Sequence, residues 1–156
     1  MSKNLLVLLF PLMMVACNKN DTPPCPEVTA TAPATEVANL RAYIQGNNIT
    51  ATEDPRGFFY RIENAGTGAK PTPCSGVTVN YVGTLTNGST FDSGTNVSFS
   101  LSRLILGWQE GIPLVGTGGT IYLYLPPSLA YGSAPNSGIP PNSNLIFKID
   151  LRAVQQ

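Results

Sequence analysis

Val77-Thr-Val-Asn-Tyr-Val-Gly-Thr-Leu85 and the Asn87-Gly88 pair that follows it predict a β-hairpin. Every second residue from Val77 to Leu85 lies on one face of the strand, and most of these residues are apolar. Asn-Gly is a signal for a two-residue type I′ turn, because both central residues of that turn need a positive φ. The chain is therefore expected to reverse after Leu85 and to continue as an antiparallel strand.

Other segments of the chain show the same alternation and predict further strands. Apolar residues alternate from Phe58 to Ile62, from Val97 to Leu101, from Ile121 to Leu125 and from Leu145 to Leu151. Residues 103–111, Arg-Leu-Ile-Leu-Gly-Trp-Gln-Glu-Gly, instead predict a short helix. Short strands with hairpin-length links favour an antiparallel sheet, and one helix must then cover one of its faces. The predicted class is α+β.

A short helix is also predicted before the first strand. Thr35 is placed to cap its beginning and Gly46 to end it. Apolar residues recur between them at helical spacing: Val37, Leu40, Tyr43 and Ile44. We expect this helix to pack on the domain; the alternative, a dimerisation helix, would offer only three turns of interface.

The beginning of the chain predicts export and lipid attachment. Lys3 precedes an apolar run from Leu5 to Ala16, which at about 12 residues is too short to span a membrane and fits the core of a signal peptide. The run ends in Met14-Val-Ala-Cys17, which resembles the lipobox of bacterial lipoproteins. The resemblance implies that residues 1–16 are removed and that Cys17 carries the lipid. The alternative is an ordinary secreted protein in which this cysteine occurs by chance.

Residues 17–34 are predicted to form a tether between the lipid and the folded part. They are rich in Asn, Thr, Pro and Ala, and so offer little apolar surface to offset the cost of ordering the chain. Export implies an oxidising compartment, in which Cys25 and Cys74 either form a disulfide or remain two free thiols. The sequence leaves both states open.

Composition excludes several classes of function. The chain carries nine basic and nine acidic residues, so it has no net positive charge that would indicate nucleic-acid binding. It contains no histidine, which excludes Ser-His-Asp triads, histidine general bases and histidine-ligated metal sites.

Phrases along residues 55–156, taken in order, resemble the FKBP family of peptidyl-prolyl cis/trans isomerases. The resemblance rests on the Val77–Leu85 strand with Asn87-Gly88 and on six further phrases: Thr90-Phe-Asp-Ser93, Ile105-Leu-Gly-Trp-Gln-Glu-Gly111, Ile121-Tyr-Leu-Tyr-Leu-Pro126, Leu129-Ala-Tyr-Gly132, Gly138-Ile-Pro-Pro141 and Leu145-Ile-Phe147. It implies an antiparallel sheet curled around one short helix, with an apolar pocket between them. Residues 35–54 are then expected to be a separate short helical segment before this domain.

The resemblance also implies which residues form the pocket. The residues at matching positions are Tyr81, Phe91, Asp92, Leu104, Ile105, Trp108, Tyr131, Ile139 and Phe147. Trp108 would form the floor, while Tyr131 and the Ile105 backbone N–H would bind carbonyl groups of the substrate. Val97 stands where the family usually has an aromatic residue, and the stretch from Phe99 to Trp108 is about two residues shorter than in small members. Both departures concern the rim, and so bear on substrate preference and macrolide binding.

These residue types suit prolyl isomerisation. The barrier to rotation about an Xaa-Pro amide is about 18–20 kcal/mol of lost resonance. A catalyst needs only to bind the twisted amide, which is less polar, better than the planar one. That requires no nucleophile, metal or cofactor.

The function expected from the sequence is therefore a peptidyl-prolyl isomerase that assists the folding of proline-containing polypeptides in the cell envelope. The alternative is a peptide-binding chaperone or assembly module that uses the same pocket without turnover. A lipid on Cys17 would hold the protein at a bacterial membrane, on the periplasmic or outer-membrane face.

Overall fold

The computed structural model describes residues 25–134 and 136–155. The predicted signal peptide, Cys17 and the predicted tether before residue 25 lie outside these residues. Among the helices of the described part, none is long and apolar enough to cross a membrane.

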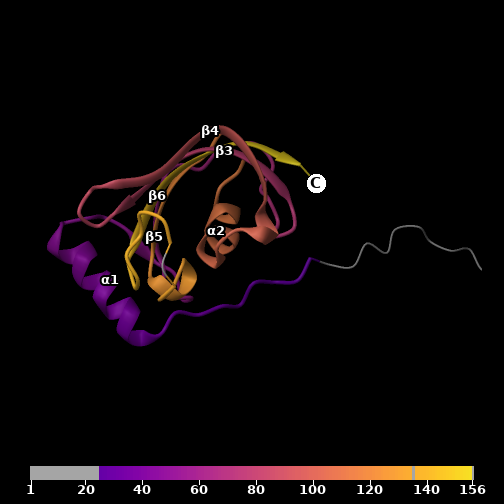
Figure 1. Cartoon of the computed structure of the whole chain (residues 1–156). Coiled ribbons are helices and arrows are strands. Elements are labelled where there is room, and N and C mark those ends of the chain that lie inside the picture. The colour runs from indigo at the N-terminus through magenta and orange to yellow at the C-terminus, as the bar shows by residue number, and fades with distance from the viewer. Residues whose placement is uncertain (1–24, 135, 156) are drawn as a thin grey trace, which may run out of the picture.

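The core of the fold is one antiparallel sheet of six strands, in the order β1-β2-β5-β6-β3-β4. In Figure 1 the sheet arches over a short helix, α2, which lies in its hollow. This confirms the predicted α+β class. The strands are β1 (Thr52–Glu53), β2 (Phe59–Asn64), β3 (Gly76–Leu85), β4 (Thr90–Ser100), β5 (Thr120–Leu125) and β6 (Leu145–Gln155).

The hairpin between β3 and β4 is present, but its turn is not the predicted type I′. Leu85 N–H bonds to Ser89 O over 2.9 Å, which closes a three-residue loop. Gly88 has a φ of 86°, whereas the non-glycine residues with positive φ in the described chain do not include Asn87. A three-residue loop needs a positive φ at its last position only, and Gly88 supplies it.

Helix α2 spans Leu106–Gly111 and packs closely on the inner face of β5. A Cβ at Gly107 would overlap the side chain of Leu125, and one at Gly111 would overlap that of Leu123. The predicted helix over residues 103–111 is therefore too long. A 3-10 turn, η1 (Leu101–Arg103), and two extended residues precede α2 in the structure.

Helix α1 (Ala34–Gly46) covers the outer face of the sheet. Three consecutive residues of β5, Leu123–Leu125, are all buried, so both faces of the sheet are covered at that point. Figure 1 shows the strands β5 and β6 between α1 and α2. The predicted packing of this helix on the domain is confirmed by its buried residues, Val37, Leu40 and Ile44.

The predicted cap of α1 is wrong. The helix begins at Ala34, one residue before Thr35, and no side chain caps its first turn. Pro33 precedes the first helical residue, and its carbonyl accepts bonds from Glu36 N–H and Val37 N–H at 3.0 and 3.1 Å. The backbone carbonyl of Pro33 thus starts the helix, and the side-chain cap predicted for Thr35 is not formed.

The later part of the predicted tether lies against the domain instead of being free of it. A disulfide joins Cys25 to Cys74, with an S–S distance of 2.02 Å. Ala32 is buried, and its N–H bonds to Arg56 O over 2.9 Å. A covalent bond and backbone pairing thus hold a segment whose side chains have little apolar surface.

Two further predictions need correction: the start of the main domain at residue 55, and the start of its first strand at Phe58. Strand β1 already pairs with β2, so the sheet begins before residue 55. Strand β2 starts at Phe59, one residue after the predicted start, and Phe58 is buried before it. Ile62 is 39% exposed because β2 extends past its short neighbour β1 at the edge of the sheet.

Candidate active site

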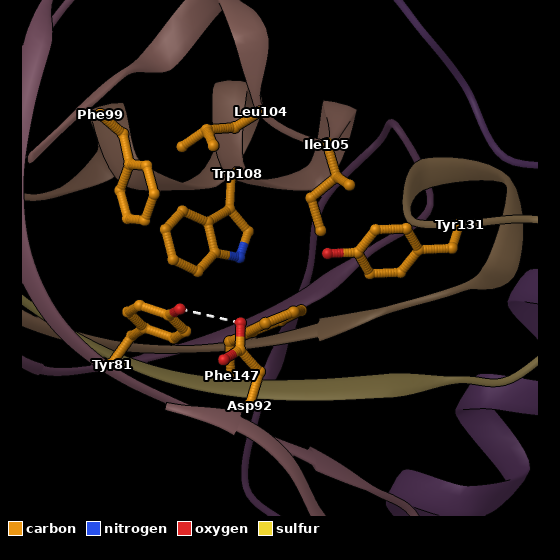
Figure 2. A pocket seen from close by; sticks show the side chains of 8 residues that line it. All are labelled: Tyr81, Asp92, Phe99, Leu104, Ile105, Trp108, Tyr131 and Phe147. Atoms are coloured by element: carbon orange, nitrogen blue, oxygen red, sulfur yellow. Dashed lines mark hydrogen bonds between the residues drawn. The ribbon is translucent and has the colours of Figure 1, made fainter. Parts of the chain in front are cut away.

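A cavity of about 120 Å³ opens between the inner face of the curled sheet and α2 (Figure 2). Strands β3, β4 and β6 supply one wall, while the segment leading into α2 and the loop after β5 supply the others. Its lining residues are Tyr81, Asp92, Phe99, Leu104, Ile105, Trp108, Tyr131 and Phe147.

Trp108 lies at the centre of an aromatic cluster. Its ring centroid is 5.2 Å from those of Tyr81 and Phe147 and 6.1 Å from that of Phe99, and all three pairs are edge-on. Such edge-to-face contacts add about 0.5–1.5 kcal/mol each beyond area burial. They hold the indole in one orientation, and Trp108 is only 4% exposed.

One hydrogen bond in the cavity wall joins a tyrosine to a carboxylate. Tyr81 Oη donates to Asp92 Oδ2 over 2.8 Å, while Asp92 Oδ1 accepts from Ser93 N–H, also at 2.8 Å. Burial, together with this bond to Asp92, raises the pKa of Tyr81 to about 12. The Tyr81 hydroxyl therefore keeps its proton at neutral pH and remains a donor.

Tyr131 and Ile105 face each other across the mouth of the cavity. Figure 2 shows the Tyr131 hydroxyl pointing toward the Ile105 side chain. Tyr131 is 37% exposed, and its pKa is raised by burial and, to a smaller extent, by the negative charge of Asp92. Its hydroxyl is thus a protonated donor that an incoming ligand can reach.

The floor contains one unused donor. Trp108 Nε1 is buried and has no hydrogen-bond partner among the described residues. Within residues 25–134 and 136–155, no group of three or more His, Cys, Asp or Glu side chains is arranged to hold a metal ion. The cavity can therefore enclose an uncharged, mainly apolar group and offer it hydroxyl donors at the rim.

Most of the residues predicted for the pocket come together in this cavity. Those that line it are Tyr81, Asp92, Leu104, Ile105, Trp108, Tyr131 and Phe147. Phe91, Val97 and Ile139 do not line it. Their predicted roles in binding stay predictions.

Each of these three residues lies behind or beside the cavity wall. The ring of Phe91 packs edge-on against Phe147 with centroids 5.6 Å apart, and so supports the wall from behind. Ile139 is buried in the apolar core. Val97 packs beside Gly94, where an added Cβ would overlap its side chain.

Phe99 lines the cavity, although the sequence predicted it only as a strand residue. It stands two residues after Val97 in β4, so alternation places the two side chains on the same side of the strand. Alternation was the available signal, because it puts Phe99 on the same strand face as Val97, but it could not tell which of the two side chains reaches Trp108.

Comparisons with known proteins match one family model and several relatives. Residues 68–152 match the family model described as FKBP-type peptidyl-prolyl cis-trans isomerase. FkpA of Escherichia coli (strain K12), an FKBP-type peptidyl-prolyl cis-trans isomerase, is 45% identical over 103 residues, which cover 64% of this chain and 38% of FkpA. The outer membrane protein MIP of Legionella longbeachae is 45% identical over 107 residues, covering 65% of this chain and 46% of MIP. The chain thus spans less than half the length of these relatives.

Solved structures show the same fold. The crystal structure of FkpA from Escherichia coli superposes with a TM-score of 0.70 and 38% identity, covering 78% of this chain and 60% of that one. A peptidyl-prolyl cis-trans isomerase from Pseudomonas syringae pv. tomato superposes with a TM-score of 0.69 and 32% identity, covering 81% of this chain and 99% of that one.

Proposed function

This chain belongs to the FKBP-type peptidyl-prolyl cis-trans isomerase family, and from that membership we propose that it catalyses cis/trans isomerisation of Xaa-Pro bonds in polypeptides. The observation that carries the proposal is the aromatic cavity above Trp108. A proline ring is apolar and small enough for a cavity of this kind.

The physical basis is the difference in polarity between the planar and the twisted amide. When the amide twists, the nitrogen lone pair no longer conjugates with the carbonyl, and the group becomes less polar than in its planar form. Water favours the planar form, whereas an apolar slot reduces that preference. Each tenfold acceleration requires about 1.4 kcal/mol of such differential binding.

The lining residues have distinct proposed roles. Trp108 and Phe147 enclose the proline ring, with Leu104 and Phe99 completing the apolar slot. Tyr131 Oη and the Ile105 N–H bind carbonyl groups on either side of the rotating bond. Tyr81 and Asp92 keep one wall in place through their 2.8 Å hydrogen bond.

We further propose that the protein acts on exported polypeptides in the cell envelope, anchored through a lipid on Cys17. The Cys25–Cys74 disulfide supports an oxidising compartment. The name of the relative MIP, an outer membrane protein, is consistent with such a location. Macrolides that occupy the cavity would act as inhibitors.

The test is exchange spectroscopy by NMR on a short Xaa-Pro peptide with the purified full chain. We expect cis/trans exchange well above the uncatalysed rate, and its loss in Trp108→Ala once circular dichroism has shown that the variant is folded. A matched pair of Tyr→Phe variants distinguishes an effect on the cavity from an effect elsewhere on the protein. Tyr131→Phe removes a cavity hydroxyl and is expected to slow exchange, whereas Tyr122→Phe, at a position that does not line the cavity, is expected to leave it unchanged.

Binding of the peptide without faster exchange would refute the isomerase proposal. It would instead favour the peptide-binding chaperone or assembly module. Fast exchange that persists in folded Trp108→Ala would place the activity outside this cavity.

A further inference from the structure

The peptide unit between Leu104 and Ile105 is a joint between two short helical turns. Leu104 has φ −91° and ψ 173° at the end of η1, and Ile105 has φ −58° and ψ 149° before α2. Both residues are extended, so this peptide belongs to neither turn. Its orientation depends on other contacts, because no helical hydrogen bond holds its carbonyl.

Gln109 supplies such a contact from the second turn of α2. Its Nε2 donates to Leu104 O over 2.7 Å and points toward Ser102 O at 3.5 Å. Both neighbours are carbonyl oxygens, which can only accept, so the amide nitrogen and not the amide oxygen must face them. The 2.7 Å bond is short for an N–H···O contact, and it is partly buried.

The N–H of the same peptide unit belongs to Ile105, a residue that lines the cavity. In a trans peptide the C=O and N–H point in opposite directions, so holding Leu104 O also sets the direction of Ile105 N–H. No described residue accepts a hydrogen bond from this N–H. Both residues of the joint line the cavity.

We propose that Gln109 is a positioning residue for isomerisation, which holds and polarises the Leu104–Ile105 peptide so that its N–H is presented to a substrate carbonyl. This inference rests on the proposed function, since it needs the Ile105 N–H to bind substrate. Gln109 itself does not line the cavity, so it would act through the peptide that it holds and not by contact with the substrate.

Two physical effects support the role. A peptide between two extended residues can flip by opposite rotation about ψ of Leu104 and φ of Ile105, and a bond to its oxygen opposes that flip. Hydrogen bonds in a chain also polarise one another, so donation to Leu104 O makes Ile105 N–H a better donor. A donor that is in place before the substrate arrives gives its full binding energy, because no free energy is spent on reorienting it.

The experiment compares Gln109→Met and Gln109→Glu with the full-length wild type. Methionine keeps the length of the side chain and loses the donor, so we expect kcat/KM to fall about three- to tenfold. The Gln109→Glu variant has the same shape but presents a carboxylate to Leu104 O at neutral pH. The carbonyl oxygens disfavour the carboxylate, so its pKa should lie above the ordinary glutamate value of about 4.3. Its activity relative to wild type should therefore recover as the pH falls toward that value, where a protonated carboxyl again donates a hydrogen bond. Arg103→Gln, on the exposed end of η1, is the control and should match wild type at every pH.

A spectroscopic measurement tests the contact without using activity. The amide ¹H and ¹⁵N resonances of Ile105 should shift in both Gln109 variants and not in Arg103→Gln, and peptide addition should move them less than in wild type. An active wild type with unchanged Ile105 resonances in the variants, or a Gln109→Glu deficit that is independent of pH, would overturn this inference alone. An inactive wild type would overturn the proposed function, while the resonances of the free protein would still decide whether Gln109 holds the peptide.

Discussion

The hydroxyl of Tyr81 on β3 donates a hydrogen bond to Oδ2 of Asp92 on β4 across 2.8 Å. Tyr81 also packs edge-on against Trp108, with ring centroids 5.2 Å apart. One side chain therefore links the two strands of the hairpin to the floor of the cavity. Its position is set on one side by an aromatic contact and on the other by a carboxylate.

The first prediction concerns the titration of Tyr81. Its pKa is raised to about 12, first by burial and then by the bond and charge of Asp92. Asp92→Ala removes both the hydrogen bond and the charge but leaves the burial, so the pKa of Tyr81 should fall below 12 and stay above the ordinary value of 10. NMR of ¹³Cζ-labelled tyrosine measures it. Glu63→Gln removes a carboxylate that pairs with Lys148 instead, and should leave Tyr81 unchanged.

Isomerase activity provides a second measurement on the same variant. We expect Asp92→Ala to lower kcat/KM about three- to tenfold, because one hydrogen bond of the wall is lost. Wild-type kcat/KM together with an unchanged Tyr81 pKa would show that the Tyr81–Asp92 bond does not organise the wall.

A second prediction concerns the space at Gly83. A Cβ there would lie 2.6 Å from Phe91 Cζ and 2.9 Å from Phe147 Cε1. Gly83→Ala should therefore displace both rings and lower the free energy of unfolding by about 1–3 kcal/mol. Urea unfolding measures this, and peptide affinity should fall as well because Phe147 lines the cavity.

Gly46→Ala is the matched control for that substitution. No atom lies within 4 Å of a Cβ built at Gly46, which is the last residue of α1. Alanine is the better helix former, so this variant should equal or exceed wild-type stability. Equal stability of Gly83→Ala and wild type would show that the aromatic wall is looser than its contacts indicate.

A third prediction concerns the disulfide. Cys25 and Cys74 are separated by 49 residues, and closing a loop of that length restricts the unfolded chain by about 4 kcal/mol. The double variant Cys25→Ser, Cys74→Ser should lose stability of that order in urea unfolding. Wild type treated with a dithiol reductant should match it, and the variant should not respond to the reductant. A reductant effect that persists in the variant would contradict the pairing.

A fourth prediction follows from the buried carboxyl of Glu110. Burial raises its pKa to about 7, Arg56 opposes the shift and Asp54 adds to it, while neither carboxylate oxygen has a hydrogen-bond partner among the described residues. The folded protein therefore keeps a proton that the unfolded chain, with the ordinary pKa of 4.5, releases. Stability should fall as the pH rises from about 4.5 to about 7 and change little from this cause above that range.

Glu110 lines a second, open cavity, together with Arg56 and Glu27 among others. The size of this fall is about 2 kcal/mol, less than the full 1.4 kcal/mol per pKa unit, because the open side of that cavity lets solvent screen the carboxyl. Urea unfolding at pH 5 and pH 8 measures it. Glu110→Gln should abolish the difference, whereas Glu27→Gln, at the rim of the same cavity, should retain it. A pH dependence that is the same in wild type and Glu110→Gln would assign the proton to another group.

Local sequence pattern predicted helix α1 but not the placement of residues 25–33, which the Cys25–Cys74 disulfide holds against the domain. Apolar spacing was enough to find α1, because a helix that packs on a core must repeat its apolar side chains every three to four residues. The same reasoning failed at residues 25–33, which have almost no apolar repeat. Their placement depends on Cys74 and Arg56, both far along the chain, and distant partners leave no periodic signal in the segment itself.

The residues of the candidate site likewise fall into those that local sequence predicted and those that it did not. Alternation and the ordered family phrases predicted seven of the side chains that line the cavity, because strand faces and helix position follow from local sequence. Phe99 was missed and Phe91, Val97 and Ile139 lie outside the lining, because the way in which the sheet curls over α2 decides which side chains reach Trp108.

By itself, the sequence determined the α+β class, five of the six strands in their order along the chain, the short helix with its tryptophan, and the absence of histidine chemistry. These depend on local periodicity and residue type. Only the tertiary structure decided that Cys25 pairs with Cys74, that α1 covers the outer face of the sheet, and that Gln109 Nε2 donates to Leu104 O. Such contacts join atoms brought together by the packing of the whole chain, and their energies depend on distances that no single segment sets.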